Sequence, residues 1–77
     1  MTEFGVCIAE FNNSNIKVTD IIKCSSYKDA MKTYISKAID EECKLRDDIW
    51  LVYIDGNEII QFEQFTRKVK SQRVKIN

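Results

Sequence analysis

The spacing of apolar residues changes twice along this chain of 77 residues, and these changes restrict the folds open to it. Apolar residues alternate with a period of two in residues 3 to 24 and again in residues 47 to 65, as in β-strands. Between these regions they recur at every third and fourth residue, as along one face of a helix. The order β-β-α-β-β predicts an α+β fold in which one amphipathic helix packs on a four-stranded antiparallel sheet.

A polar cluster marks a chain reversal within the first strand region. The residues from Asn12 to Asn15 are all of types that are common in turns. Pairing the flanking runs across this turn sets Glu10 opposite Lys17, and the opposite charges support the register. Residues 3 to 24 are therefore predicted to form a β-hairpin.

The helix and the second hairpin have their own boundary signals. Ser26 and Asp29 have the spacing of a helix N-cap, and the helical apolar period then continues until about Arg46, where we expect the helix to end. The pair Asp55-Gly56 is typical of a type I′ turn, which requires positive φ at both central residues. Residues 47 to 65 are predicted to form the second hairpin around this turn.

Both faces of the predicted sheet are apolar. In the second hairpin one face carries Ile49, Leu51, Tyr53, Ile60 and Phe62, and the other carries Trp50, Val52, Ile54 and Ile59. In the first hairpin one face carries Phe4, Val6, Ile8 and Ile21, and the other carries Cys7, Ala9, Phe11, Ile16 and Val18. One helix covers only one face, so the other needs a second cover.

Three arrangements would cover the second face of the sheet: the sheet curls on itself, the C-terminal segment folds back over it, or a second chain binds to it. The C-terminal segment offers few apolar side chains among its charges, and burial of unpaired charge is unfavourable. Because a large exposed apolar patch usually marks an interface, the second chain is favoured. We expect a protein partner or a homodimer to bind through Trp50, Val52, Ile54 and Ile59.

The charges of the chain are divided between its two ends. Residues 66 to 77 carry five basic side chains and no acid: Arg67, Lys68, Lys70, Arg73 and Lys75. Residues 1 to 65 carry the other seven basic residues and all 12 acidic ones. This division predicts a single domain over 1–65 and a basic C-terminal tail over 66–77 that is not needed for folding, or that adds a short fifth strand at Arg73 to Ile76. The tail is expected to bind acidic protein surface or the phosphates of nucleic acid.

No set of catalytic or metal-binding residues is present in the sequence. It has no histidine, its two glycines form no phosphate-binding loop, and its acidic clusters read as solvated surface. We therefore expect a non-enzymatic protein with no cofactor and no metal. The odd number of cysteines, Cys7, Cys24 and Cys43, favours reduced thiols. No apolar run is long enough for a membrane helix and no signal peptide is apparent, so a cytoplasmic location and no membrane contact are expected.

The very short chain, the lack of an active-site set and the sheet with two apolar faces together resemble the small accessory proteins with which viruses and phages block host machinery, including anti-CRISPR inhibitors. The resemblance covers the order of the elements and carries over no residue. It implies a protein that acts in the host cytoplasm by binding and inhibiting a partner. The alternative is a nucleic-acid-binding or regulatory protein that uses the basic tail, as a monomer or a dimer.

Overall fold

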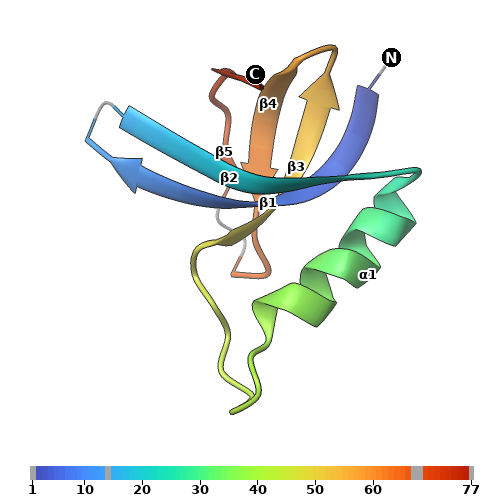
Figure 1. Ribbon diagram of the computed structural model, residues 1–77, viewed down its shortest axis with the longest axis vertical. Helices are drawn as coiled ribbons and strands as arrows, with labels where there is room; N and C mark the ends of the chain where they lie inside the picture. Colours follow the sequence, from blue (N-terminus) through green and yellow to red (C-terminus); the bar gives the residue numbers. More distant parts are fainter. Residues whose placement is uncertain (1, 14, 67–68, 77) are drawn as a thin grey trace.

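The chain folds into a curled antiparallel sheet with one helix on its outer side, as Figure 1 shows. The computed structural model describes residues 2–13, 15–66 and 69–76. In chain order the elements are β1 (Thr2–Asn12), β2 (Asn15–Cys24), α1 (Tyr27–Ala38), β3 (Ile49–Asp55), β4 (Glu58–Glu63), β5 (Val69–Lys70) and β6 (Val74–Lys75). The strands lie in the order β2-β1-β3-β4-β5, and β6 also pairs with β4. The predicted α+β fold is confirmed, with two short strands added after the second hairpin.

The first hairpin has the predicted register near its tip. Glu10 lies opposite Lys17, and Phe11 lies opposite Ile16. Ser14, within the predicted turn, lies outside the described residues. The cross-strand charge pattern was therefore a valid guide to the pairing of β1 with β2.

A β-bulge in β2 places Ile21 on the face opposite to the predicted one. In the middle of the hairpin the register shifts by one, so that β2 has two residues where β1 has one. Asp20 has a φ of 52° at this point, a left-handed conformation that Asp tolerates better than most residues. The extra residue turns Ile21 away from the face of Val6, so the prediction that these two side chains share a face is wrong.

The helix begins where the sequence predicts and ends earlier. Ser26 has an extended backbone, and its hydroxyl oxygen accepts a hydrogen bond from the backbone N–H of Asp29 at 3.2 Å. The helix ends at Ala38, and Ile39 is already extended. The prediction that the helix continues to about Arg46 is wrong.

The carboxylate of Asp40 explains this early end. Its Oδ1 accepts hydrogen bonds from the backbone N–H groups of Glu42 and Lys44, both at 2.9 Å, which closes a tight loop. An acid at the C-terminal end of a helix also opposes the helix dipole. The loop brings Leu45 back to pair with Ile39.

The turn of the second hairpin is centred one residue later than predicted. Asp55 pairs with Glu58, so the two central residues are Gly56 and Asn57. Of these two, only Gly56 has a positive φ, at 64°. Glycine at the first central position is the arrangement of type II′ turns, and the predicted type I′ turn is wrong.

A second bulge, in β4, moves Phe62 to the other face of the sheet. The register between β3 and β4 shifts by one at Ile60. After the shift Phe62 lies opposite Val52 and shares the face of that residue. The prediction that Phe62 lies on the face of Leu51 is therefore wrong.

The described part of the C-terminal segment belongs to the sheet. Both β5 and β6 pair with the outer edge of β4, and the backbone N–H of Ile76 donates to the carbonyl oxygen of Asn57 at 2.6 Å. Val74 and Ile76 pack against the buried residues of the concave face. The predicted strand within Arg73 to Ile76 is present as β6, and the expectation that the segment is a poor cover for the sheet is wrong for Val74 and Ile76.

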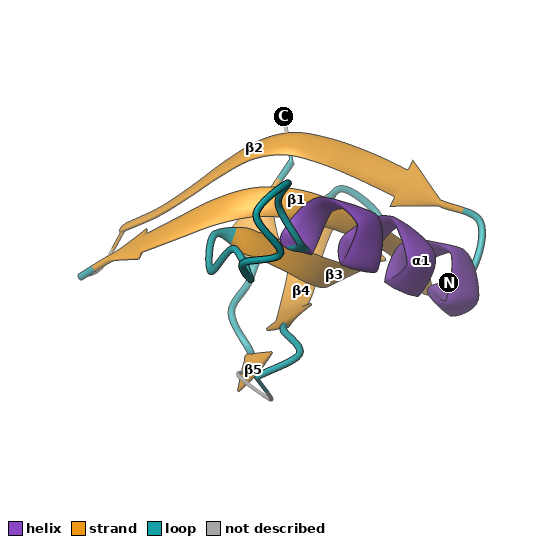
Figure 2. Cartoon of the chain, turned by 90° about the horizontal axis from the view of Figure 1, so that it is seen from below, coloured by secondary structure: helices purple, strands orange, loops and turns teal. Residues whose placement is uncertain are grey.

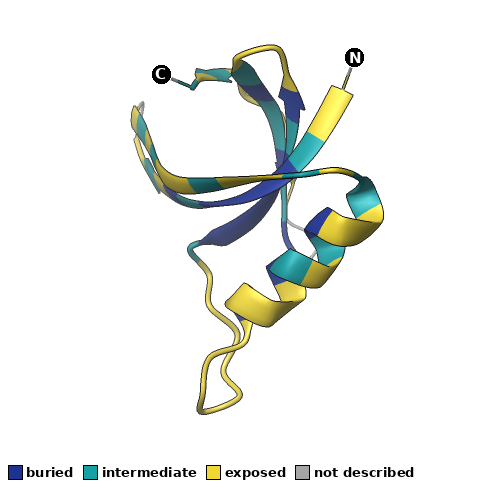
Figure 3. Ribbon diagram, turned by 45° about the vertical axis from the view of Figure 1, so that its right-hand side comes forward, coloured by how far each residue is buried: buried dark blue, intermediate teal, exposed yellow. Residues whose placement is uncertain are grey.

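Two hydrophobic clusters lie on the two faces of the sheet. The outer cluster, between the sheet and α1, consists of Val6, Ala30, Tyr34, Ala38, Ile49 and Leu51. The inner cluster, on the concave face, consists of Cys7, Ala9, Trp50, Val52, Ile54, Ile59 and Phe62. Figure 2 shows α1 alongside β1 and β3, and Figure 3 shows the β1–β2 hairpin bending away from α1. The chain thus covers both faces of its own sheet.

Aromatic rings close the concave side. The ring of Phe11, near the end of β1, lies 5.1 Å from that of Phe62 and 5.0 Å from that of Trp50, both edge to face. The indole Nε1 of Trp50 is buried and has no hydrogen-bond acceptor among the described residues. Burial of an unpaired donor costs about 1–3 kcal/mol, which the packing of the surrounding rings offsets.

Replacement of Gly5 by alanine is expected to destabilise the fold more than replacement of Gly56. A Cβ at Gly5 would lie 2.5 Å from the backbone oxygen of Ile22, so β1 and β2 would have to separate. A Cβ at Gly56 would meet nothing within 4 Å, and only its positive φ is unfavourable. We expect Gly5→Ala to lower the free energy of unfolding by about 2–3 kcal/mol and Gly56→Ala by about 1 kcal/mol, as measured by urea denaturation. Equal effects would contradict the close approach of β1 and β2.

Candidate protein-binding surface

The four residues predicted to bind a partner lie in the interior. Trp50 is 3% exposed, and Val52, Ile54 and Ile59 are fully buried. All four belong to the inner cluster, against which side chains of the curled β1–β2 hairpin and the residues Val74 and Ile76 pack. The prediction of an exposed apolar sheet face is therefore wrong, because side chains of the same chain cover this face.

The basic tail residues that the structure describes lie at the edge of the sheet. The Lys70 ammonium group lies 5.8 Å from the centre of the Phe11 ring, and Arg73 lies 3.8 Å from the carboxylate of Glu58. Lys75 is exposed, and its backbone pairs with Glu58. Arg67 and Lys68 lie outside the described residues. Two of the three described cations thus have contacts within the chain.

The exposed large hydrophobic side chains gather near the C-terminal end of α1. Ile35, Ile39, Leu45 and Phe65 are 38%, 45%, 46% and 49% exposed. Ile35 lies in the last turn of α1, Ile39 is the first residue after the helix, and Leu45 pairs with Ile39. Phe65 stacks edge to face on Tyr34, with ring centres 5.2 Å apart. We refer to Ile35, Ile39, Leu45 and Phe65 as the apolar rim.

Hydrogen bonds fix the backbone that carries Phe65. Its N–H donates to the hydroxyl oxygen of Tyr34 at 3.0 Å. The buried side chain of Gln64 donates to the carbonyl oxygens of Asp47 and Ile49, at 2.7 and 3.0 Å. These bonds hold the end of β4 against α1 and the start of β3, so the Phe65 ring is presented from a fixed backbone.

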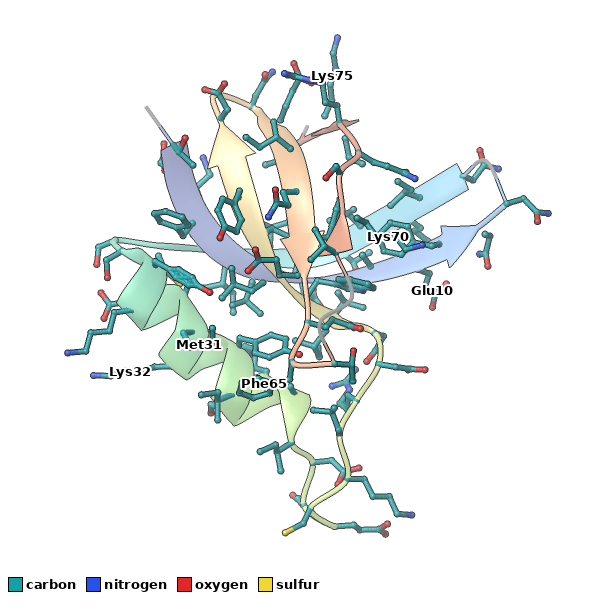
Figure 4. The ribbon with its side chains drawn as sticks, turned by 180° about the vertical axis from the view of Figure 1, so that it is seen from behind. Glu10, Met31, Lys32, Phe65, Lys70 and Lys75 are labelled. Atoms are coloured by element: carbon teal, nitrogen blue, oxygen red, sulfur yellow. The ribbon has the colours of Figure 1, made fainter. Side chains whose placement is uncertain are left out.

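A pocket of about 150 Å³ lies beside the apolar rim, and we call it the α1–β4 groove. It is lined by Tyr27, Met31 and Tyr34 from α1, Leu51 from β3, Glu63 from β4 and Phe65. Figure 4 shows Met31 and Phe65 on the same side of the molecule, from α1 and from the chain after β4. The helix α1 packs on β1 and β3. The groove between α1 and β4 therefore lies at the edge of the sheet area that the helix covers.

Glu63 gives the groove a negative charge. Its carboxylate accepts hydrogen bonds from the Nε2 of Gln61 at 2.8 Å and from the hydroxyl of Tyr27 at 3.5 Å. Burial, together with the charge of Glu63, raises the pKa of Tyr27 and raises that of Tyr53 to about 12. Both phenols therefore stay neutral donors at neutral pH.

The opposite side of the apolar rim is basic. Lys28 and Lys32 are exposed and lie on the face of α1 next to Ile35, as their helical spacing requires. The molecule thus presents a negative groove, an apolar rim and a positive helix face in sequence. Figure 4 shows Lys32 extending away from the body of the protein.

The carboxylates of the acidic clusters have structural contacts. Asp40 caps the loop after α1, and Asp48 holds Arg46 through two hydrogen bonds of 3.0 and 2.7 Å. The bond to Arg46 lowers the pKa of Asp48. Within residues 2–13, 15–66 and 69–76, no three side chains of the metal-binding types come together.

The three thiols differ in their surroundings, and all three are free. Cys7 is buried in the inner cluster, and burial raises its pKa to about 12. Cys24 is half-buried next to the hydroxyl of Thr33, and Cys43 is exposed in the loop after α1. The neutral thiol of Cys7 acts as a small apolar side chain.

Sequence reasoning missed the apolar rim and the groove. The helical period puts Ile35 with Tyr34 and Ala38 on the apolar face and so predicts a buried side chain, but the side chain is 38% exposed because it lies at the edge of the helix face that packs on the sheet. The sequence does contain one signal: Lys28 and Lys32 share a helix face with Ile35. The position of Phe65 depends on the end of β4 and could not be derived from the local pattern.

Comparison of the chain with known protein families, with curated proteins and with solved structures finds no match. In the part of the chain that the structure describes, no helix has the length and apolar character needed to cross a membrane.

Proposed function

We propose that this protein is a small non-enzymatic module that binds another protein through the apolar rim and the α1–β4 groove. The grouping of four exposed large hydrophobic side chains near the C-terminal end of α1, one of which, Phe65, also lines the α1–β4 groove, carries this proposal. Single exposed hydrophobic residues are common on protein surfaces, but a group of them usually marks an interaction site. Ile22 and Val69, the other exposed large hydrophobics among the described residues, lie on separate strands at opposite sides of the sheet.

The charges beside the apolar rim set the orientation of a partner. A complementary surface carries a positive group toward Glu63, apolar side chains in the centre and negative groups toward Lys28 and Lys32. Complementary charges of this kind mainly increase the association rate and exclude wrong partners. We therefore expect binding that is moderately sensitive to salt and is dominated by the apolar centre.

Inhibition of the partner, as in viral or phage accessory proteins, remains part of this proposal. A bound module blocks its partner when it covers the surface that the partner uses. We place this binding in the cytoplasm, where the free thiols of Cys7, Cys24 and Cys43 stay reduced. Nucleic-acid binding through the tail is the weaker proposal, because Lys70 and Arg73 contact Phe11 and Glu58.

The replacement Ile35→Gln is expected to weaken partner binding by about tenfold or more, because it removes an apolar group from the centre of the interface. Ile22→Gln is the matched control, since Ile22 is 37% exposed and Ile35 is 38% exposed, but Ile22 lies on β2. The partner is first captured from nuclease-treated lysate at low and moderate salt. The wild type and both variants are then titrated with the purified partner by calorimetry.

Equal affinity of the Ile35→Gln and wild-type proteins would show that the apolar rim is not the binding surface. Selective loss of binding in Ile22→Gln would move the site to the edge of β2. If nuclease treatment removes all binding and salt abolishes it steeply, the nucleic-acid alternative would replace the proposed function.

A further inference from the structure

We propose that the α1–β4 groove receives a lysine side chain of the partner protein, with its ammonium group on the carboxylate of Glu63. The proposal deepens the proposed function, on which it rests, by naming the chemical group that the groove recognises. It follows from three observations: the charge at the groove, the nature of its walls and the hydrogen bonds that Glu63 already accepts.

Among the described residues, the carboxylate of Glu63 has only neutral donors. Gln61 and Tyr27 donate to it, and no ion pair among the described residues includes it. Glu63 is half-buried, so water solvates it less completely than a surface carboxylate. An ammonium group at this position would form a charge-assisted hydrogen bond, which is stronger than the bonds from neutral donors.

The walls of the groove fit the methylene stem of a lysine. Met31, Leu51 and Phe65 supply apolar surface, and the negative group lies beside them on β4. Lysine buries its stem along apolar surface while its charged end reaches a polar partner. An apolar anchor such as leucine would displace water from the charge of Glu63 without supplying a cation, so the groove discriminates against it.

The bonds that Glu63 already makes favour lysine over arginine. Its carboxylate accepts hydrogen bonds from Gln61 and Tyr27, which compete with the bidentate pairing that arginine prefers. Lysine presents a compact point charge, which suits one carboxylate that already accepts two other hydrogen bonds.

Binding of n-butylammonium, followed by NMR, tests this proposal on the full chain without a partner. We expect saturable shifts of the Leu51 methyl, Met31 methyl and Phe65 ring signals at millimolar concentrations and low salt. 1-Butanol has the same number of non-hydrogen atoms and no charge, and it should bind about tenfold more weakly. n-Butylguanidinium should also bind more weakly, because Gln61 and Tyr27 compete with its bidentate pairing on Glu63.

Glu63→Gln is expected to reduce the affinity for n-butylammonium to that for 1-butanol. Glu58→Gln, at the other end of β4, is the matched control and should leave the affinity unchanged. Equal binding of the amine and the alcohol in the wild type, or an unchanged affinity in Glu63→Gln, would overturn the proposal. An absence of saturable shifts would also overturn it, whereas the proposed function is tested separately, by partner binding of the Ile35→Gln variant.

Discussion

A chain that ends at Phe65 is expected to lose most of its stability, because it lacks both strands that pair with the outer edge of β4. Without β5 and β6 the edge of β4 is open, and Ile59 and Phe62 of the inner cluster lose the cover of Val74 and Ile76. Loss of burial for two such aliphatic side chains costs about 3 kcal/mol or more. This is a large part of the 5–15 kcal/mol typical of a small domain. Thermal denaturation followed by circular dichroism measures the loss.

A charge-only variant separates packing from electrostatics in this experiment. Lys70→Gln, Arg73→Gln and Lys75→Gln together keep both strands and remove the three described cations. Because exposed ion pairs contribute about 0–1 kcal/mol, this variant should melt close to the wild type. A truncated chain that melts like the wild type would show that the inner cluster does not depend on β5 and β6.

Phe62→Ala is expected to destabilise the protein by about 3–5 kcal/mol, and Leu51→Ala by about 2–5 kcal/mol. Phe62 is fully buried among the rings of the inner cluster, and Leu51 is 1% exposed in the outer cluster. Because each face has its own buried cluster, large losses from both positions are the signature of a sheet that is covered on both sides. Chemical denaturation of the two variants gives the free energies.

Ile35→Ala is the control for these two variants. Ile35 is a comparably large aliphatic residue that the pattern of the sequence places in the core and the structure places at the surface. Its replacement in an exposed helix position should cost less than about 1 kcal/mol. A loss equal to that of Leu51→Ala would mean that α1 is rotated on the sheet relative to the structure described above.

The order of elements followed from local patterns, but the faces of the strands depended on the bulges. Alternation is a sound guide only while the register is unbroken. Each bulge, near Asp20 in β2 and at Ile60 in β4, reversed the face of the next apolar residue. Ile21 and Phe62 both moved to the inner cluster, and no local signal in the sequence marks either bulge.

The end of the helix and the role of the tail depended on interactions that simple periodicity does not represent. Asp40 ended α1 through bonds to the backbone of the following loop. The tail packed because its few apolar residues, Val74 and Ile76, alternate with cations that stay in water at the edge of the sheet. The expectation that rested on the charges of the tail therefore underestimated how far Val74 and Ile76 pack on the sheet.

The candidate site was not predictable from the sequence, because it consists of side chains that remain exposed where α1 ends its contact with the sheet. The tryptophan and its apolar neighbours were the strongest sequence signal for an interface, and the curl of the sheet buried them. The apolar rim and the carboxylate of Glu63 come close together only in the folded structure, where the end of β4 lies beside α1. Burial within the chain thus decided which apolar residues remain available to a partner.

That the chain covers both faces of its own sheet is tested most directly by the fluorescence of Trp50, the single tryptophan. The structure predicts blue-shifted emission that acrylamide quenches weakly, unchanged on dilution, in a protein that sediments as a monomer across the same concentration range. Emission that shifts to the red, or becomes readily quenched, as an oligomer dissociates on dilution would show that a second chain covers the inner cluster.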